Sequence, residues 1–237
     1  ARGEEMCIVN KSDKLLVIWQ DKKNKLRHVI GTLTKDGGYI FEYNTNNLKE
    51  LQAVGFEPLV AFPDYYEQYK SNTLFTSFLV RLPDKRRSDM KSILDNYGIE
   101  KYDEFELLKL SGGVLPTDTI EFVEPIDLDQ SKIVRDFYIA GTKYTRLCES
   151  ICENMKRFKI GDKLYYVCEP DNVVDKNAIK MVTDENEDLG YIPAYYAKQV
   201  TLSVLQKRDI EFRIINITQV NKNCHECIKV RMKIEKK

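Results

Sequence analysis

The residues best placed to do chemistry lie in one polar stretch, EPDNVVDKNAIKM, at positions 169–181. Asn172 and Asn177 carry amides that can cap or brace their own loop. Asp175 is a hydrogen-bond acceptor of the kind that a terminal ribose hydroxyl needs. The stretch predicts a polar binding pocket, or alternatively a structural loop in which Asp175 and Asn177 hold the fold together.

Basic and aromatic residues could complete such a pocket. Lys143 follows Gly141 by two residues, in a predicted loop where its ammonium could meet a phosphate. Tyr144 offers a ring face to a nucleic-acid base, and such stacking is worth about 1–3 kcal/mol per base. Lys176 and Lys180 are further candidate phosphate contacts, or else solvated surface.

No enzyme motif is visible in the sequence. His28 lies in a predicted strand with no carboxylate or cysteine nearby along the chain, so no acid–base partner can be nominated. The chain has no G-x-S-x-G, H-E-x-x-H or Walker pattern. We therefore expect no enzyme and no cofactor.

A zinc site is the weaker interpretation of the cysteines near the C-terminus. Cys224 and Cys227 flank His225 in CHEC, but tetrahedral zinc usually takes a second pair of ligands. Cys148 and Cys152 could supply that pair only if their predicted helix packs against the last hairpin. A strand turn with incidental thiols is the favoured interpretation.

Composition favours a soluble protein with a real core. Of 237 residues, 43% are hydrophobic and 31% are charged, and no apolar run approaches the roughly 18 residues that span a membrane. The opening ARGEEMCIVNKSDK has no apolar segment typical of a secretory signal. We expect a cytoplasmic protein of two domains, with no membrane partner and with its six cysteines reduced.

The net charge of zero hides an asymmetry. Residues 1–131 hold 17 Lys/Arg and 22 Asp/Glu, a net charge of −5, whereas residues 132–237 hold 20 and 15, a net charge of +5. The C-terminal half is therefore the better candidate for contact with phosphates.

The N-terminal half reads as strands followed by helices. LLVIWQD and HVIGTLTKD flank a polar turn like a hairpin, and GGYIFEYN alternates like a half-buried strand. Helical spacing then appears in SNTLFTSFLVRL. A second helix is predicted with Ser88 as its cap and Gly98 as its end, and a third helix and a strand follow in DEFELLKLSGGVLPTDTIEF.

The C-terminal half is mostly β with two helices. Strands are predicted at 137–144, in KLYYVCE, AIKMVTD and LGYIP, and in a final pair, EFRIINITQV and CIKVRMKIE. TRLCESICENMKRF and AYYAKQVTLSVLQKR are amphipathic and predict the helices. We expect domains at 1–124 and 136–237, joined by a polar linker at 125–135.

Three blocks of the C-terminal half, FYIAGTKY, GDKLYYVCEPDNVVDKNAIKM and LGYIPAYYAKQV, resemble the HIRAN domain in order and spacing. The resemblance covers about 136–220 and implies a small β-barrel related to the OB fold. In a eukaryotic helicase-like member of the family the domain grips the 3′ end of single-stranded DNA, so the resemblance implies DNA recognition. By position, Lys143 and Tyr144 match the basic–aromatic pair of the family, and Asn172 and Asp175 match its end-binding loop.

One position departs from that pattern. Val174 stands where the eukaryotic family has an aromatic residue before the aspartate. A valine cannot stack on a base as a ring does, so this wall of the pocket is weaker or recognises something else.

The N-terminal half looks like the N-terminal subdomain of HipA-type toxin kinases. VIGTLTKDGGYIFEYN, EPLVAFPDY, FLVRLPDKRRSDM and DEFELLKLSGGVLPTDTIEF follow the family order across 15–124, with Val114-Leu115-Pro116 in place of Gly-Ala-Leu. The resemblance implies an α+β fold and a role in partner contacts. No kinase core follows, because glycine-rich phosphate loops and H-R-D or D-F-G sequences are missing.

Two functions stay open from the sequence. The first is a prokaryotic DNA-binding protein whose HIRAN half recognises single strands, 3′ ends or lesions while residues 15–124 dock a protein partner. The second is a non-catalytic adaptor, or an antitoxin-like regulator of a HipA-type toxin system. The basic excess favours DNA, whereas Val174 favours the adaptor.

Overall fold

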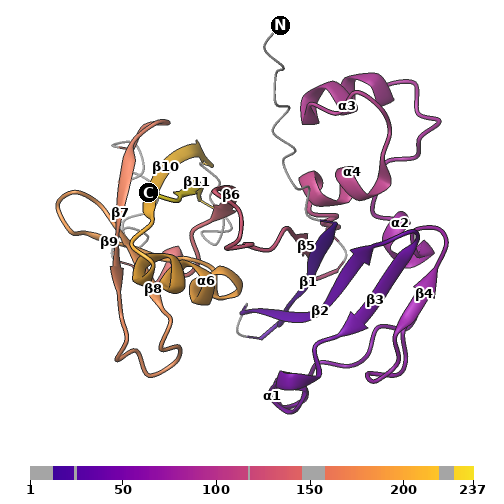
Figure 1. The fold of residues 1–237 in the computed structure, drawn as a ribbon, viewed down its shortest axis with the longest axis horizontal. Helices are drawn as coiled ribbons and strands as arrows, with labels where there is room; N and C mark the ends of the chain where they lie inside the picture. Colours follow the sequence, from indigo (N-terminus) through magenta and orange to yellow (C-terminus); the bar gives the residue numbers. More distant parts are fainter. Residues whose placement is uncertain (1–12, 24–25, 117, 146–157, 219–226) are drawn as a thin grey trace, which may run out of the picture. The chain divides into compact units, whose positions relative to one another are not determined.

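The computed structural model describes residues 13–23, 26–116, 118–145, 158–218 and 227–237. The chain divides into two compact units, Ala1–Pro125 and Ile126–Lys237, and each unit has an antiparallel sheet of its own (Figure 1). Helices accompany both sheets, so the predicted α+β class is confirmed. In the described residues, no helix is long and apolar enough to cross a bilayer.

The first unit is built on a five-stranded sheet with the order β4-β3-β2-β1-β5. Its core is aliphatic and aromatic, and Val17, Leu33 and Phe41 are completely buried. The alternating residues of β3 explain this, because every second side chain faces the core. The elements are β1 (Lys14–Gln20), β2 (Arg27–Lys35), β3 (Tyr39–Tyr43), the 3₁₀ helix η1 (Thr45–Asn47), α1 (Leu48–Ala53), β4 (Tyr69–Ser71), α2 (Thr76–Leu79), α3 (Met90–Tyr97), α4 (Glu104–Ser111) and β5 (Ile120–Val123).

The helices of this unit differ in detail from the sequence prediction. The apolar positions Leu74, Phe78 and Leu82 are all buried as expected, but only Thr76–Leu79 is helical. The second helix starts later than expected, since its N-cap is Asp89 and not Ser88. It ends as predicted at Gly98, whose φ of 67° suits a residue without a side chain.

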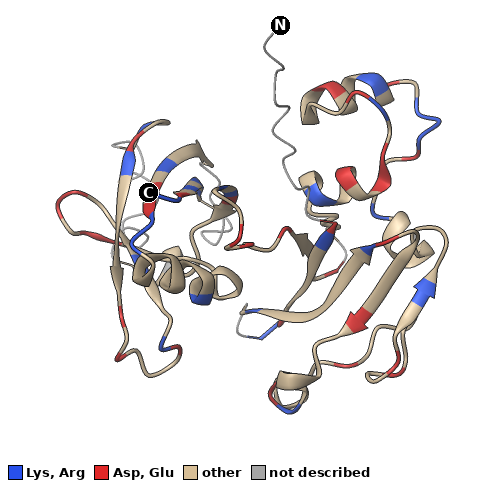
Figure 2. Ribbon diagram, viewed as in Figure 1, with Lys and Arg blue, Asp and Glu red and all other residues tan. Residues whose placement is uncertain are grey.

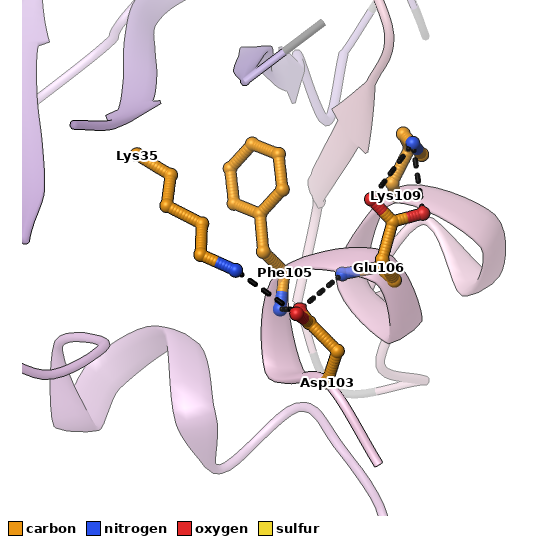
Figure 3. Close-up of polar contacts among 5 residues, drawn as sticks. All are labelled: Lys35, Asp103, Phe105, Glu106 and Lys109. Carbon is orange, nitrogen blue, oxygen red and sulfur yellow. Dashed lines mark hydrogen bonds and ion pairs between the residues drawn. The ribbon is translucent and has the colours of Figure 1, made fainter. Parts of the chain in front are cut away.

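An aspartate fixes the start of α4. The Asp103 carboxylate accepts hydrogen bonds from the backbone N–H groups of Phe105 and Glu106, at 2.9 and 3.0 Å. It also pairs with Lys35 at the end of β2, with 2.9 Å between Nζ and Oδ2 (Figure 3). A second pair, Lys109 with Glu106, lies one turn further along the helix. These contacts tie the helix N-terminus to the sheet.

The second unit is built on a six-stranded sheet with the order β6-β11-β10-β7-β8-β9. The two edges meet, because Ala140, just after β6, forms a bridge with Tyr191 of β9. Both hydrogen bonds of this bridge are 2.8 Å, so the sheet closes into the predicted small barrel. The elements are β6 (Lys132–Tyr138), the 3₁₀ helix η2 (Thr142–Tyr144), β7 (Lys163–Cys168), β8 (Ile179–Val182), β9 (Asp188–Tyr191), α6 (Ala194–Leu205), β10 (Asp209–Ile217) and β11 (Ile228–Glu235).

Alternation again explains the strands of the barrel. In β11 the side chains of Ile228, Val230, Met232 and Ile234 are buried, while the residues between them are half-buried or exposed. The last two strands pair along their length, as the sequence predicted. The expected linker 125–135 runs into β6, whose first residues already pair with β11.

Candidate nucleic-acid interface

The loop between β7 and β8 is held by its own side chains. The Asn172 Oδ1 accepts hydrogen bonds from the backbone N–H groups of Val174 and Asp175, at 2.9 and 3.2 Å. The backbone adds bonds from the Asn172 N–H to the Glu169 carbonyl and from the Ala178 N–H to the Asp175 carbonyl. The bracing role predicted for Asn172 is therefore present in the structure.

Asp175 braces the loop with one of its two carboxylate oxygens. Its Oδ1 accepts the backbone N–H of Asn177 at 2.8 Å and the Asn177 side-chain amide at 3.3 Å. The side chain is half-buried. Among the contacts of the described residues, none engages Oδ2, so this oxygen keeps its capacity to accept a hydrogen bond.

The tip of the loop exposes two aliphatic side chains. Val173 is 99% exposed and Val174 is 85% exposed, and Lys176 beside them is also exposed. Both valines therefore present an apolar surface to solvent, on a loop that is braced by its own hydrogen bonds. The loop carries charges of both signs (Figure 2).

A carboxylate that sequence reasoning missed lies at the base of the loop. Glu169 accepts hydrogen bonds from the Asn172 amide and the Tyr191 hydroxyl through Oε2, both at 3.0 Å. Its Oε1 lies 2.6 Å from Nζ of Lys180, which is also 3.7 Å from Oδ2 of Asp188. The charge of Lys180 is thus engaged within the protein. We call Glu169, Lys180 and Tyr191 the Glu169 cluster.

The cluster shifts the proton affinities of its members. The hydrogen bond from Lys180 lowers the pKa of Glu169, and the same bond raises the pKa of Lys180. Burial, followed by the bond to Glu169, raises the pKa of Tyr191. At neutral pH the cluster therefore holds an ion pair and a neutral phenol.

The basic–aromatic segment follows the bridge that closes the barrel. Gly141 has a φ of 75°, and the Thr142 hydroxyl donates to the Ile139 carbonyl at 3.1 Å. Tyr144 is 72% exposed at the end of η2. Lys143 lies in η2, but its side chain is outside the described part of the structure.

Glycine is required where β9 meets this segment. A Cβ on Gly190 would lie 2.3 Å from the Ala140 carbonyl oxygen, and the φ of Gly190 is 118°. This close approach allows Ala140 to pair with Tyr191. The bridge in turn fixes where η2 leaves the barrel.

The remaining sequence candidates are the cysteines and the histidine considered for zinc. Cys224, His225 and the pair Cys148 and Cys152 lie outside the described residues, while the side chain of Cys227 is buried. Within the described ranges, no group of three or more His, Cys, Asp or Glu could hold a metal ion.

His28 has the carboxylate neighbour that the sequence did not suggest. The hairpin of β1 and β2 brings Oδ2 of the buried Asp21 to 4.0 Å from Nε2 of His28. Burial lowers the pKa of His28, while Asp21 and Glu50 act to raise it. A neutral imidazole beside Trp19 results, with the ring centroids 5.8 Å apart.

A curled antiparallel sheet with a braced polar loop and an exposed aromatic turn defines a small β-barrel domain. Residues 134–234 match the family model of the HIRAN domain, which the sequence motifs resembled. Residues 24–116 match the HipA N-terminal domain. Both resemblances are confirmed, and a HIRAN domain implies DNA binding.

Solved structures and a curated relative are also similar to the chain. The HIRAN domain of human HLTF has a TM-score of 0.34 and 16% identity, covering 45% of this chain and 78% of that structure. A protein from Lactobacillus plantarum has a TM-score of 0.35 and 16% identity, covering 45% and 99%. A Fanconi-associated nuclease 1 homolog of Arabidopsis thaliana is 25% identical over 153 residues, 61% of this chain; the chain spans 16% of that relative.

Proposed function

We propose that the HIRAN half binds the 3′ end of single-stranded DNA without catalysis, and that the HipA-like half docks a protein partner. The observation that carries the proposal is Asp175, which matches the end-binding loop of the family. One of its oxygens braces the loop through Asn177, and the other is left as an acceptor for a terminal hydroxyl.

The remaining contacts follow from the same geometry. Tyr144 supplies an exposed ring for a base, and Lys143, in the same turn, is the candidate phosphate contact. The aliphatic tip formed by Val173 and Val174 packs against a sugar or base face without stacking. Specificity then depends on the hydroxyl acceptor more than on stacking.

The direct test compares two fluorescent oligonucleotides, one with a free 3′ hydroxyl and one with a 3′ phosphate. We expect tighter binding of the hydroxyl strand, because a phosphate beside the Asp175 carboxylate is repelled and cannot donate the same hydrogen bond. The oligonucleotides are expected to be recovered intact. Equal binding of both strands, or cleavage, would contradict the proposal.

Asp175→Asn isolates the role of the carboxylate. An asparagine keeps an oxygen for the Asn177 N–H but turns the other acceptor into a donor. We expect the preference for the hydroxyl strand to disappear while the fold stays intact. Asp171→Ala, at an exposed acid in the same loop, is the matched control and should retain the preference. Lys143→Ala should lower the salt slope of binding by about one.

The alternative is a protein–protein adaptor or antitoxin-like regulator. Val173 and Val174 favour it, because exposed aliphatic side chains suit contact with an apolar protein surface. This function predicts that the chain binds neither oligonucleotide. It also predicts that a Val173→Ser, Val174→Ser double variant no longer binds a HipA-type partner protein.

A further inference from the structure

The Glu169 cluster connects elements that are far apart in the sequence. Glu169 directly follows β7, Lys180 belongs to β8 and Tyr191 ends β9. Nζ of Lys180 also lies 5.7 Å from the centroid of the Tyr191 ring, so the three side chains contact one another pairwise. The Glu169 carboxylate thereby receives donors from β8 and β9, in addition to the Asn172 amide of its own loop.

The Glu169 cluster is connected to both segments of the candidate interface, the Asn172–Asp175 loop and the Lys143–Tyr144 turn. On one side, the Asn172 amide donates to Glu169, and Asn172 in turn holds the amides of Val174 and Asp175. On the other side, the backbone of Tyr191 pairs with Ala140, directly before the turn that carries Lys143 and Tyr144. The hydrogen bond between Tyr191 and Glu169 thus connects the two segments through side chains.

The polar groups of the Glu169 cluster already bond to one another, which suits a structural role in the loop better than direct contact with DNA. Both oxygens of Glu169 are engaged, and the side chains of Glu169 and Lys180 are only 23% and 27% exposed. A free carboxylate at this place would repel a phosphate, whereas the ion pair presents little net charge.

We propose that Glu169 and Tyr191 are positioning residues that set the spacing between the Lys143–Tyr144 turn and the Asn172–Asp175 loop. This inference rests on the proposed function, in which both segments hold the same DNA end. A binding site works only when its groups are held near their productive geometry, so a loosened loop loses affinity although every contact residue is still present.

Two conservative variants test the inference. Tyr191→Phe removes one hydroxyl and keeps the ring. Glu169→Gln keeps the shape but leaves one acceptor oxygen for three donors and places an amide NH₂ against another donor. Tyr165→Phe is the matched control, since Tyr165 lies four residues before Glu169 and has its ring near Lys163.

We expect both variants to bind the hydroxyl strand about tenfold more weakly, the scale of one hydrogen bond to a charged group. Binding of the 3′-phosphate strand should change less than about twofold, and Tyr165→Phe should behave as the unaltered chain. Retention of full affinity by both variants would overturn the inference.

Amide hydrogen exchange supplies a measurement that needs no DNA. The N–H groups of Val174 and Asp175 should exchange about tenfold faster in Tyr191→Phe and Glu169→Gln, while those of β11 stay protected. Unchanged exchange at the loop would overturn the positioning role. If the unaltered chain shows no preference between the two strands but exchange rises in the variants, the proposed function fails and the positioning role stands.

Discussion

The carboxylates of Glu169 and Asp175 lie six residues apart and make different kinds of contact. Asp175 was recognisable from the sequence, because its partner Asn177 is two residues away and such local bonds are typical of Asx turns. Glu169 was missed, because its partner Tyr191 is 22 residues away and meets it only when the barrel closes. Local spacing reveals a loop that braces itself, whereas pairs across strands depend on register, which the sequence does not show.

His28 makes the stability of the first unit depend on pH. Burial holds its pKa below the ordinary value of about 6.5, so the folded state binds this proton less readily than the unfolded chain. The contribution of His28 is therefore fully present above about pH 6.5 and is lost as the pH falls towards the depressed folded pKa. Asp21 and Glu50 oppose the shift without cancelling it.

The measurement uses urea unfolding followed by the fluorescence of Trp19, the single tryptophan of the chain, which contacts His28. We expect the midpoint to fall between pH 7 and pH 5.5, and to fall less in His28→Gln, which does not titrate. Parallel curves for the two proteins would show that His28 carries no such linkage.

At the scale of elements, strands were easier to predict than helices. Strand alternation in β3 and β11 depends on one repeated contact with the core, so the pattern is regular. Helix boundaries were less certain. Ser88 looked like a cap by residue type, yet Asp89 takes that position and its carboxylate pairs with Arg87 instead of the helix. The predicted helix at 145–158 lies almost wholly outside the described residues.

The start of α4 gives a prediction about an element. Asp103→Ala removes both the cap and the pair with Lys35, and should destabilise the first unit by about 1–2 kcal/mol. Asp103→Asn keeps an acceptor for the cap and should cost less than about 1 kcal/mol. The control is Asp89→Ala, at a helix start without a side-chain cap, which should cost less than about 0.5 kcal/mol.

The destabilisation caused by Asp103→Ala should depend on pH. Burial acts to raise the pKa of Asp103, but the hydrogen bonds from the Glu106 amide and from Lys35 outweigh it and the pKa is lowered. Its stabilisation is therefore present above the unfolded value of about 3.9 and is lost as the pH falls through the folded pKa. The difference between the unaltered chain and Asp103→Ala should shrink below about pH 4, and a difference that persists there would exclude this linkage.

At the scale of the whole molecule, the chain combines two units with separate cores. The buried residues of the first unit, such as Phe41 and Phe78, form one cluster, and the barrel encloses its own residues, such as Ile214 and Val230. The opposite net charges of the two halves fit this division, with the basic excess on the half that matches the HIRAN domain. Separate cores and sheets predict two unfolding transitions.

Two variants assign those transitions. Gly190→Ala places a Cβ 2.3 Å from the Ala140 carbonyl at a φ of 118°, and should destabilise the barrel by about 2–3 kcal/mol. In thermal unfolding followed by circular dichroism, it should lower only the transition that Trp19 fluorescence does not report. Asp103→Ala should lower only the transition that Trp19 does report, by several degrees, since about 1 kcal/mol moves the midpoint of a small domain by roughly 4–8 °C. If each variant moves both transitions together, the two units fold as one cooperative body, and the binding half cannot be treated as a module that acts independently of the HipA-like half.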